Sequence, residues 1–118
     1  MEKQIQVFVE LAISEGKVDE FKTQMPAIIE RVKRNEPDMI GYQWYLSDDQ
    51  TKCYVIEWLK NSQAWLIHLS NVGQIAPALF AIAPITRLEV FGDISKDVED
   101  ALKPFGAVIY KHLSGFIR

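Results

Sequence analysis

The sequence predicts an α+β fold, a ferredoxin-like split βαβ sandwich with helices on one face of an antiparallel sheet. Alternating apolar and polar residues mark four strands, and apolar residues spaced three and four apart mark the helical segments between them. Their order is strand, helix, strand, strand, helix, strand. This core covers residues 4–92, a C-terminal appendage covers residues 93–118, and residues 1–118 are predicted to form a single domain.

The first strand and the first helix follow each other directly. Residues 4–13 alternate between apolar and polar side chains, which predicts a half-buried strand. After Gly16, the spacing of apolar residues predicts an amphipathic helix that ends near Glu36. Pro26 lies inside this helix. Because proline removes a backbone donor and clashes with the preceding turn, we expect a kink or a break there.

Two β-rich runs follow, at residues 40–47 and 52–59. The sequence SDDQT joins them, and its serine and aspartate side chains favour a turn through local hydrogen bonds. An antiparallel hairpin is therefore predicted. From Ser62 the chain is predicted to be helical, with an interruption near Gly73 and a second piece that ends near Ala83.

The last predicted strand of the core is the alternating sequence ITRLEVFGD. In the appendage, Ser95 is a suitable N-cap for a short helix, which Pro104 and Gly106 would end. Residues 107–112 could then form a short strand.

Composition excludes several functional classes. The net charge is −3 and basic residues form no cluster, so we expect no nucleic-acid partner. One cysteine, two histidines and no clustered carboxylates predict neither a disulfide nor a metal site. No signal peptide or membrane-spanning run is evident, which favours a cytoplasmic location without membrane association. No nucleotide-binding or acyl-transfer motif is present.

Strand alternation sorts the side chains onto two faces, and we assign the more apolar one to the helices. This helix face is predicted to form the core and the wall of a partly aromatic pocket for a small ligand. For any single ring, simple core packing is the alternative to ligand binding. The candidate substrate-binding residues on this face are Tyr42, Trp44, Tyr54 and Trp58.

The opposite face mixes apolar and charged residues to an extent that soluble monomers usually avoid. We therefore predict a homodimer in which two sheets pack face to face. The alternative is a monomer with scattered exposed apolar residues. Glu57 is expected on this face, where an ion pair with Arg87 is favoured over a role as general base. The candidate interface residues are Phe8, Tyr45, Val55, Glu57, Arg87, Glu89 and Phe91.

His68 is the candidate catalytic residue. At helical spacing it flanks the apolar stripe that includes Trp65 and Leu69. There it could orient or deprotonate a phenol, since the ordinary pKa of histidine lies near neutrality. A hydrogen-bonded structural histidine is the alternative.

Three sequence strings resemble the antibiotic biosynthesis monooxygenase domain, a member of the dimeric α+β barrel superfamily. They are EGKVDEFK, NEPDMIGYQWYLSDD and YVIEWLKNSQAWLIHL. The resemblance covers roughly residues 4–92, and the end of the chain, LSGFIR, is similar to that of an uncharacterised subgroup.

This resemblance implies a homodimeric, cofactor-independent monooxygenase that acts on a small aromatic, phenolic or quinol substrate. Glu57 and His68 stand at matching positions, but Leu59 replaces the aromatic residue usual two positions after the glutamate. The alternative is a non-catalytic dimeric domain that binds a small ligand or serves assembly.

Overall fold

The computed structural model describes residues 4–118, which contain one five-stranded sheet. The order across the sheet is β2-β3-β1-β4-β5, and neighbours among β1 to β4 are antiparallel, as predicted. The bounds are β1 (Ile5–Ala12), β2 (Met39–Leu46), β3 (Lys52–Leu59), β4 (Ile85–Phe91) and β5 (Val108–Tyr110).

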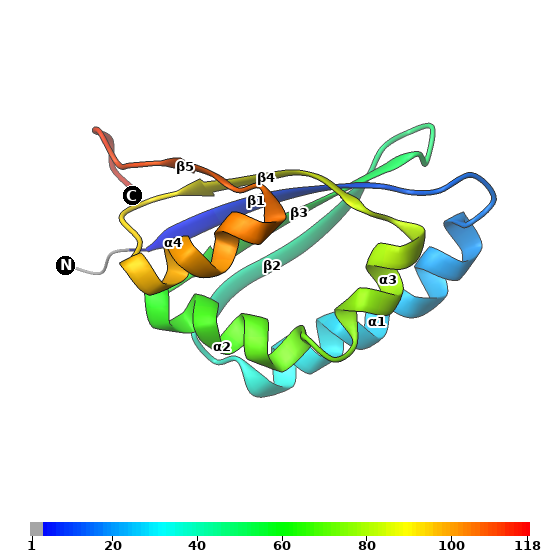
Figure 1. The fold of residues 1–118 in the computed structure, drawn as a ribbon, viewed down its shortest axis with the longest axis horizontal. Coiled ribbons are helices and arrows are strands. Elements are labelled where there is room, and N and C mark those ends of the chain that lie inside the picture. Colours follow the sequence, from blue (N-terminus) through cyan, green and yellow to red (C-terminus); the bar gives the residue numbers. More distant parts are fainter. Residues whose placement is uncertain (1–3) are drawn as a thin grey trace.

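The helices lie on one face of this sheet and leave the other face uncovered (Figure 1). Both α1 and α2 lie below the sheet in this view, and α4 crosses the same side near the chain end. The predicted α+β architecture is therefore confirmed. The helices are α1 (Val18–Asn35), α2 (Ser62–Val72), α3 (Ala76–Ile82), α4 (Lys96–Leu102) and the short 3-10 helix η1 (Lys103–Phe105).

Helix α1 runs without a break through Pro26, so the break allowed for at this position does not occur. Pro26 is exposed to solvent. The helical carbonyl that lacks a donor because of the proline can therefore be hydrated, which lowers the cost of keeping the helix continuous. The buried side of α1 carries Phe21, Ile28 and Val32.

The β2–β3 hairpin closes as its turn sequence predicts. The Asp49 carboxylate accepts hydrogen bonds from the Ser47 hydroxyl at 2.8 Å and from the Thr51 backbone N–H at 3.0 Å. Gln50 completes the turn with a φ of 59°. These local bonds fix where the hairpin reverses, and the reversal helps to set which residues of the two strands lie opposite each other.

Helices α2 and α3 are two pieces, as predicted. Asn61 caps α2, because its side-chain oxygen accepts a hydrogen bond from the Ala64 N–H at 3.0 Å. Helix α2 ends just before Gly73, and α3 ends at Ile82. Among residues 4–118, no single helix is long and apolar enough to cross a membrane; α2 and α3 pass such a test only as a pair bent by 78°.

The C-terminal appendage is built into the same structure. The Ser95 hydroxyl accepts from the Val98 N–H at 3.3 Å and caps α4, as predicted. Val98 and Leu102 are fully buried in the main hydrophobic core. After Gly106, which has a φ of 72°, β5 pairs in parallel with β4, so the sheet is mixed rather than purely antiparallel.

Candidate functional site

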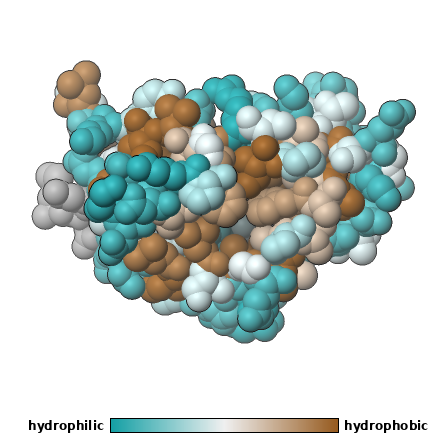
Figure 2. All heavy atoms as spheres, in the orientation of Figure 1, coloured by the Kyte–Doolittle hydropathy of each residue, from teal (hydrophilic) through white to brown (hydrophobic). Residues whose placement is uncertain are grey.

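A cavity of about 80 Å³ lies between the sheet and the helices. Figure 2 shows hydrophobic side chains around a hollow near the centre of the view, between the sheet and the helices. Pockets that enclose a whole drug-sized ligand measure about 300–1,000 Å³, so this cavity admits only a small group without movement of its walls. Its polar and aromatic lining includes Tyr42, Trp44, Glu57, Trp65 and His68.

His68 reaches the cavity from α2, where the sequence pattern places it, and is 5% exposed. Its Nδ1 atom lies 2.9 and 3.0 Å from the two carboxylate oxygens of Glu36, the residue that ends α1. Glu36 is 4% exposed. Since a charge this far from water needs a partner, the two side chains stabilise each other.

Glu57 reaches the same cavity from β3 and is 3% exposed. Its Oε1 atom lies 3.5 Å from His68 Nε2, within ion-pair range. The pair has no hydrogen bond of normal geometry, and Oε1 is buried without another partner. His68 therefore stands between two buried carboxylates, Glu36 at Nδ1 and Glu57 at Nε2.

This arrangement shifts the protonation equilibria of the site. Burial raises the pKa of Glu57 to about 7, although the nearby His68 opposes the shift. Burial alone would lower the pKa of His68, but the Glu57 and Glu36 carboxylates outweigh it, so the His68 pKa lies above its ordinary value. A group that titrates near neutrality inside an apolar cavity is typical of acid–base sites.

Aromatic rings surround the imidazole. Tyr42 meets His68 edge-on, with ring centroids 5.6 Å apart, and Trp65 lies 5.3 Å from it in a tilted arrangement. Burial, followed by the charges of Glu57 and Glu36, raises the pKa of Tyr42 well above 10. The Tyr42 hydroxyl therefore stays neutral at physiological pH and can act as a hydrogen-bond donor.

The indole N–H groups of Trp44 and Trp65 are buried and have no hydrogen-bond partner of normal geometry. The Trp44 N–H is nevertheless near enough to the Tyr42 hydroxyl to counteract part of its pKa increase. An unpaired buried donor costs about 1–3 kcal/mol. The site thus contains two buried indole N–H donors and one buried carboxylate oxygen, Glu57 Oε1, that have no hydrogen-bond partner of normal geometry.

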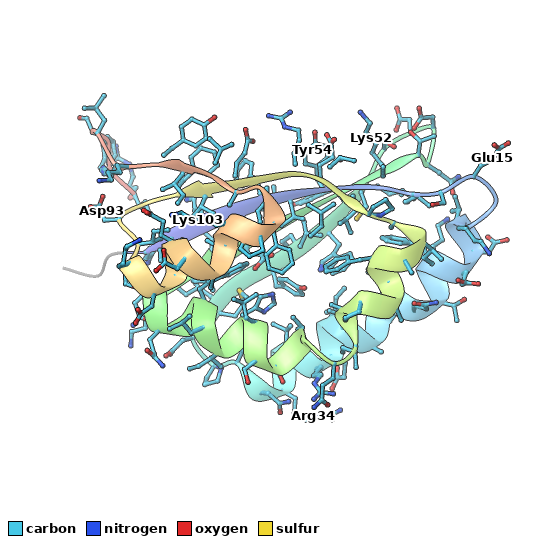
Figure 3. All side chains as sticks on the ribbon, viewed as in Figure 1. Glu15, Arg34, Lys52, Tyr54, Asp93 and Lys103 are labelled. Carbon is cyan, nitrogen blue, oxygen red and sulfur yellow. The ribbon has the colours of Figure 1, made fainter. Side chains whose placement is uncertain are left out.

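Tyr54 and Trp58 do not line the cavity, and their predicted placement on the helix face is wrong. Tyr54 lies opposite Glu10 in the β1–β3 ladder and donates its hydroxyl hydrogen bond to that carboxylate. Figure 3 shows Tyr54 pointing away from the helices. Trp58 covers Gly41, where an added Cβ would lie 2.7 Å from the indole ring.

The assignment of Val55 and Glu57 to the uncovered face is wrong for the same reason. The β1–β3 register pairs Val55 with Val9 and Glu57 with Val7, on the helix side. The favoured ion pair between Glu57 and Arg87 is therefore absent, and Arg87 instead binds Glu89 at 2.9 Å.

The sequence alone does not decide which face of β3 is buried, because both faces of this strand are apolar enough to be buried. The phase that buries Tyr54 and Trp58 leaves Glu57 exposed to solvent. An isolated carboxylate has a lower free energy in water than in the core, so this phase is favoured when no partner for Glu57 is known. His68 changes that balance, since it supplies the partner that a buried Glu57 needs. The family resemblance, which singled out Glu57 and His68 together, was the signal for the correct phase.

Other site residues were not predicted at all. Glu36 marks only the expected end of a helix, and nothing in its local sequence distinguishes it from a solvated carboxylate. Phe105, from η1 in the appendage, lines the cavity and is 46% exposed. Such contacts depend on how distant segments pack, which a local pattern does not encode. Within residues 4–118, no group of three His, Cys, Asp or Glu side chains is placed to hold a metal ion.

Several solved structures share this fold. MupZ from Pseudomonas fluorescens is 23% identical, with a TM-score of 0.86 over 100% of this chain and 91% of its own. A conserved protein from Methanosarcina mazei is 20% identical, with a TM-score of 0.65 over 80% of this chain and 95% of its own. A conserved protein of unknown function from Bacteroides thetaiotaomicron is 16% identical, with a TM-score of 0.65 over 79% of this chain and 100% of its own.

These likenesses establish the fold. The first of them covers the whole chain, including the appendage, whereas the other two cover 80% and 79% of it. No curated protein sequence matches the chain. The profile of the family named Antibiotic biosynthesis monooxygenase matches residues 5–74, which include His68, Glu57 and Glu36. More than half of the chain is matched, and the chain therefore belongs to the antibiotic biosynthesis monooxygenase family.

Proposed function

We propose that this protein is a cofactor-independent monooxygenase whose His68–Glu57 pair takes a proton from a small phenol or quinol. The observation that carries the proposal is the buried imidazole between two carboxylates, beside an apolar cavity. Family membership supports oxygenase chemistry, and the site supports the proton transfer that would start it.

In the proposed reaction, the substrate O–H bond breaks and the proton passes to the His68–Glu57 pair. The resulting phenolate supplies the electrons that reduce dioxygen. One oxygen atom forms a bond to a ring carbon, and the other leaves as water with the protons released from the substrate. A phenol and one dioxygen thus give a quinone and one water, so no external reductant is required.

The volume of the cavity limits the size of the group that can bind in it. About 80 Å³ is less than the 150 Å³ of an engineered protein cavity that binds benzene. A phenol therefore requires outward movement of a wall, and Phe105, which is 46% exposed, is the most exposed ring of the lining. Tyr42 and Trp44 remain the proposed substrate contacts among the rings selected from the sequence.

Oxygen uptake with a panel of phenols and quinols tests the activity. We expect the wild type to consume oxygen with at least one compound, and His68→Gln and Glu57→Gln to lower the rate by about 10²-fold or more. His112→Gln is the matched control, since His112 is exposed and does not line the cavity. Uptake that is no lower in His68→Gln than in His112→Gln would contradict the proposal.

The alternative function is a non-catalytic small-ligand-binding domain, and the narrow cavity is the observation that favours it. In that case no compound would support oxygen uptake, and ligand-induced thermal shifts would be unchanged in His68→Ala. A shift that disappears in His68→Ala would instead place the ligand beside the imidazole.

We also propose that the uncovered sheet face joins two copies of the chain. Phe8, Tyr45 and Phe91, all selected from the sequence, lie on this face. The ring of Phe8 packs edge-on against that of Phe91, with centroids 5.1 Å apart. The ring of Tyr110, from the appendage, stacks on Phe91 with the same centroid separation of 5.1 Å. Tyr45 is 53% exposed in the single chain. Such exposed rings favour a partner surface.

Light scattering coupled to size exclusion tests the dimer. We expect twice the chain mass of 13.5 kDa for the wild type. Tyr45→Lys should shift the equilibrium toward the monomer, because it places a charge in the contact. Ile67→Lys is the control, since Ile67 is 42% exposed on helix α2, away from the uncovered sheet face. A wild-type mass of one chain at micromolar concentration would refute the dimer.

A further inference from the structure

Glu36 is a buried carboxylate whose contacts distinguish it from an ordinary helix end. Both of its oxygens are within 3.0 Å of His68 Nδ1, and Oε2 also accepts a hydrogen bond from the Asn71 amide at 2.7 Å. Its side chain is 2% exposed. A carboxylate is an acceptor only, so this geometry requires a hydrogen on His68 Nδ1.

Asn71 is itself fixed by α1. Its amide N–H₂ also donates to the Arg31 carbonyl at 3.2 Å, and its oxygen accepts from Asn35 at 2.9 Å and from the Arg31 guanidinium at 3.3 Å. The network therefore ties the end of α1 to α2. Because it uses both ends of the Asn71 amide, it leaves the side chain little freedom to turn away from Glu36.

The other ring nitrogen of His68 has a looser partner. Glu57 Oε1 is 3.5 Å from Nε2, without hydrogen-bond geometry and without another partner. Of the two carboxylates, Glu36 is thus bound at both oxygens and Glu57 retains an open position beside the cavity. The remaining ionisable group that faces the imidazole is Tyr42, from β2, which stays neutral.

We propose that Glu36, clamped by Asn71, is a positioning residue that holds His68 as a doubly protonated imidazolium, and that Glu57 is therefore the group that exchanges a proton with the substrate. The proposal rests on the proposed function and assigns roles within its acid–base pair. The substrate O–H bond breaks, its proton forms a bond to a Glu57 oxygen, and the fixed imidazolium offsets the negative charge of the substrate anion.

The protonation state of His68 tests this assignment without any need for activity. Two-bond ¹H–¹⁵N correlation spectra of the wild type at pH 7 should show hydrogen on both ring nitrogens of His68. A neutral His68 ring at this pH would overturn the proposal, whether or not the protein consumes oxygen. In the same protein, the ¹³C signal of the Glu57 carboxyl should titrate near neutral pH; a Glu57 already ionised at pH 5 would also overturn it.

Glu36→Gln preserves the shape of the side chain and removes its charge. In this variant we expect His68 to lose its second proton at a lower pH than in the wild type, because an anion that favours the imidazolium is gone. We also expect kcat to fall about 10²-fold with little change in KM, as for a mispositioned group. Glu36→Asp should restore part of both, since it returns the carboxylate.

Glu30→Gln is the matched control on the same helix, because Glu30 is exposed and pairs only with Arg34 at 3.3 Å. It should leave the His68 titration unchanged. If Glu36→Gln does not fold, Asn71→Ala provides the second test, since it keeps the Glu36 carboxylate and removes its clamp; it too should lower the pH at which His68 deprotonates. An unchanged His68 titration in a folded Glu36→Gln or Asn71→Ala protein would refute the positioning role.

Failure of the two proposals can be told apart. A wild type with an imidazolium at His68 but no oxygen uptake would remove the monooxygenase function and leave the positioning of His68 by Glu36 intact. Oxygen uptake by a protein whose His68 is neutral would keep the monooxygenase function and remove the roles proposed for Glu36 and Glu57. The reaction would then use the imidazole itself as the base.

Discussion

Replacing Glu57 by glutamine should change how the stability of the protein depends on pH. Burial raises the pKa of Glu57 from 4.5 to about 7. The folded state therefore holds a proton that the unfolded state has already lost, and stability falls as the pH rises through about 7. A pKa difference of about 2.5, at about 1.4 kcal/mol for each pH unit, corresponds to roughly 3 kcal/mol.

His68 contributes in the same direction. Its pKa is raised, so the stability that it provides is complete below the ordinary histidine pKa and is lost as the pH rises through the folded value. Because Glu57 and His68 are coupled, the change of roughly 3 kcal/mol belongs to the pair rather than to Glu57 alone. Glu57→Gln removes one member of this pair and keeps its shape.

Urea unfolding followed by tryptophan fluorescence at several pH values between 4.5 and 8 measures the effect. The free energy of unfolding of the wild type should fall by roughly 3 kcal/mol relative to that of Glu57→Gln over this interval. The surface variant Glu30→Gln should follow the wild type. Parallel curves for the wild type and Glu57→Gln would show that Glu57 titrates at its ordinary pH, and the acid–base interpretation of the site would fail.

Three further predictions concern the scaffold. Leu79→Ala should lower the free energy of unfolding by about 2–5 kcal/mol in urea, because Leu79 is fully buried in the core; a loss below 1 kcal/mol would mean that the core refills the space. Gly41→Ala should lower the free energy of unfolding by about 1–3 kcal/mol in the same assay, since the new methyl group would lie 2.7 Å from the Trp58 ring. If this clash is the cause, the double variant with Trp58→Leu should recover part of the lost stability. Asn61→Ala should cost about 1 kcal/mol because α2 loses its cap to the Ala64 N–H, and Asn61→Ser should retain most of the stability in thermal unfolding.

The order and the approximate limits of the helices and strands were accessible from the sequence because they depend on local periodicity and caps. The alternation in β1, the helical pattern from Ser62 and the cap at Ser95 act over a few residues, and the structure shows each element near its expected place. The same periodicity predicted that His68 flanks the buried side of α2, and the structure buries it there. Local patterns therefore sufficed for one member of the site.

The other members required tertiary structure. Alternation in β3 allows two phases that are related by a shift of one residue, and composition favoured the one that exposes Glu57. The β1 register and the partner at His68 select the opposite phase, which places Glu57 in the cavity and Tyr54 and Trp58 on the uncovered face.

The sequence by itself thus determined the α+β fold, the family and the location of His68 beside the buried face of a helix. Only the tertiary structure placed Glu36, from the C-cap of α1, and Glu57, from β3, on either side of that imidazole. The physical reason is that burying a carboxylate is unfavourable until a distant residue supplies its charge or hydrogen-bond partner. Whether that partner is present is a property of packing between segments, and no single segment of the chain contains it.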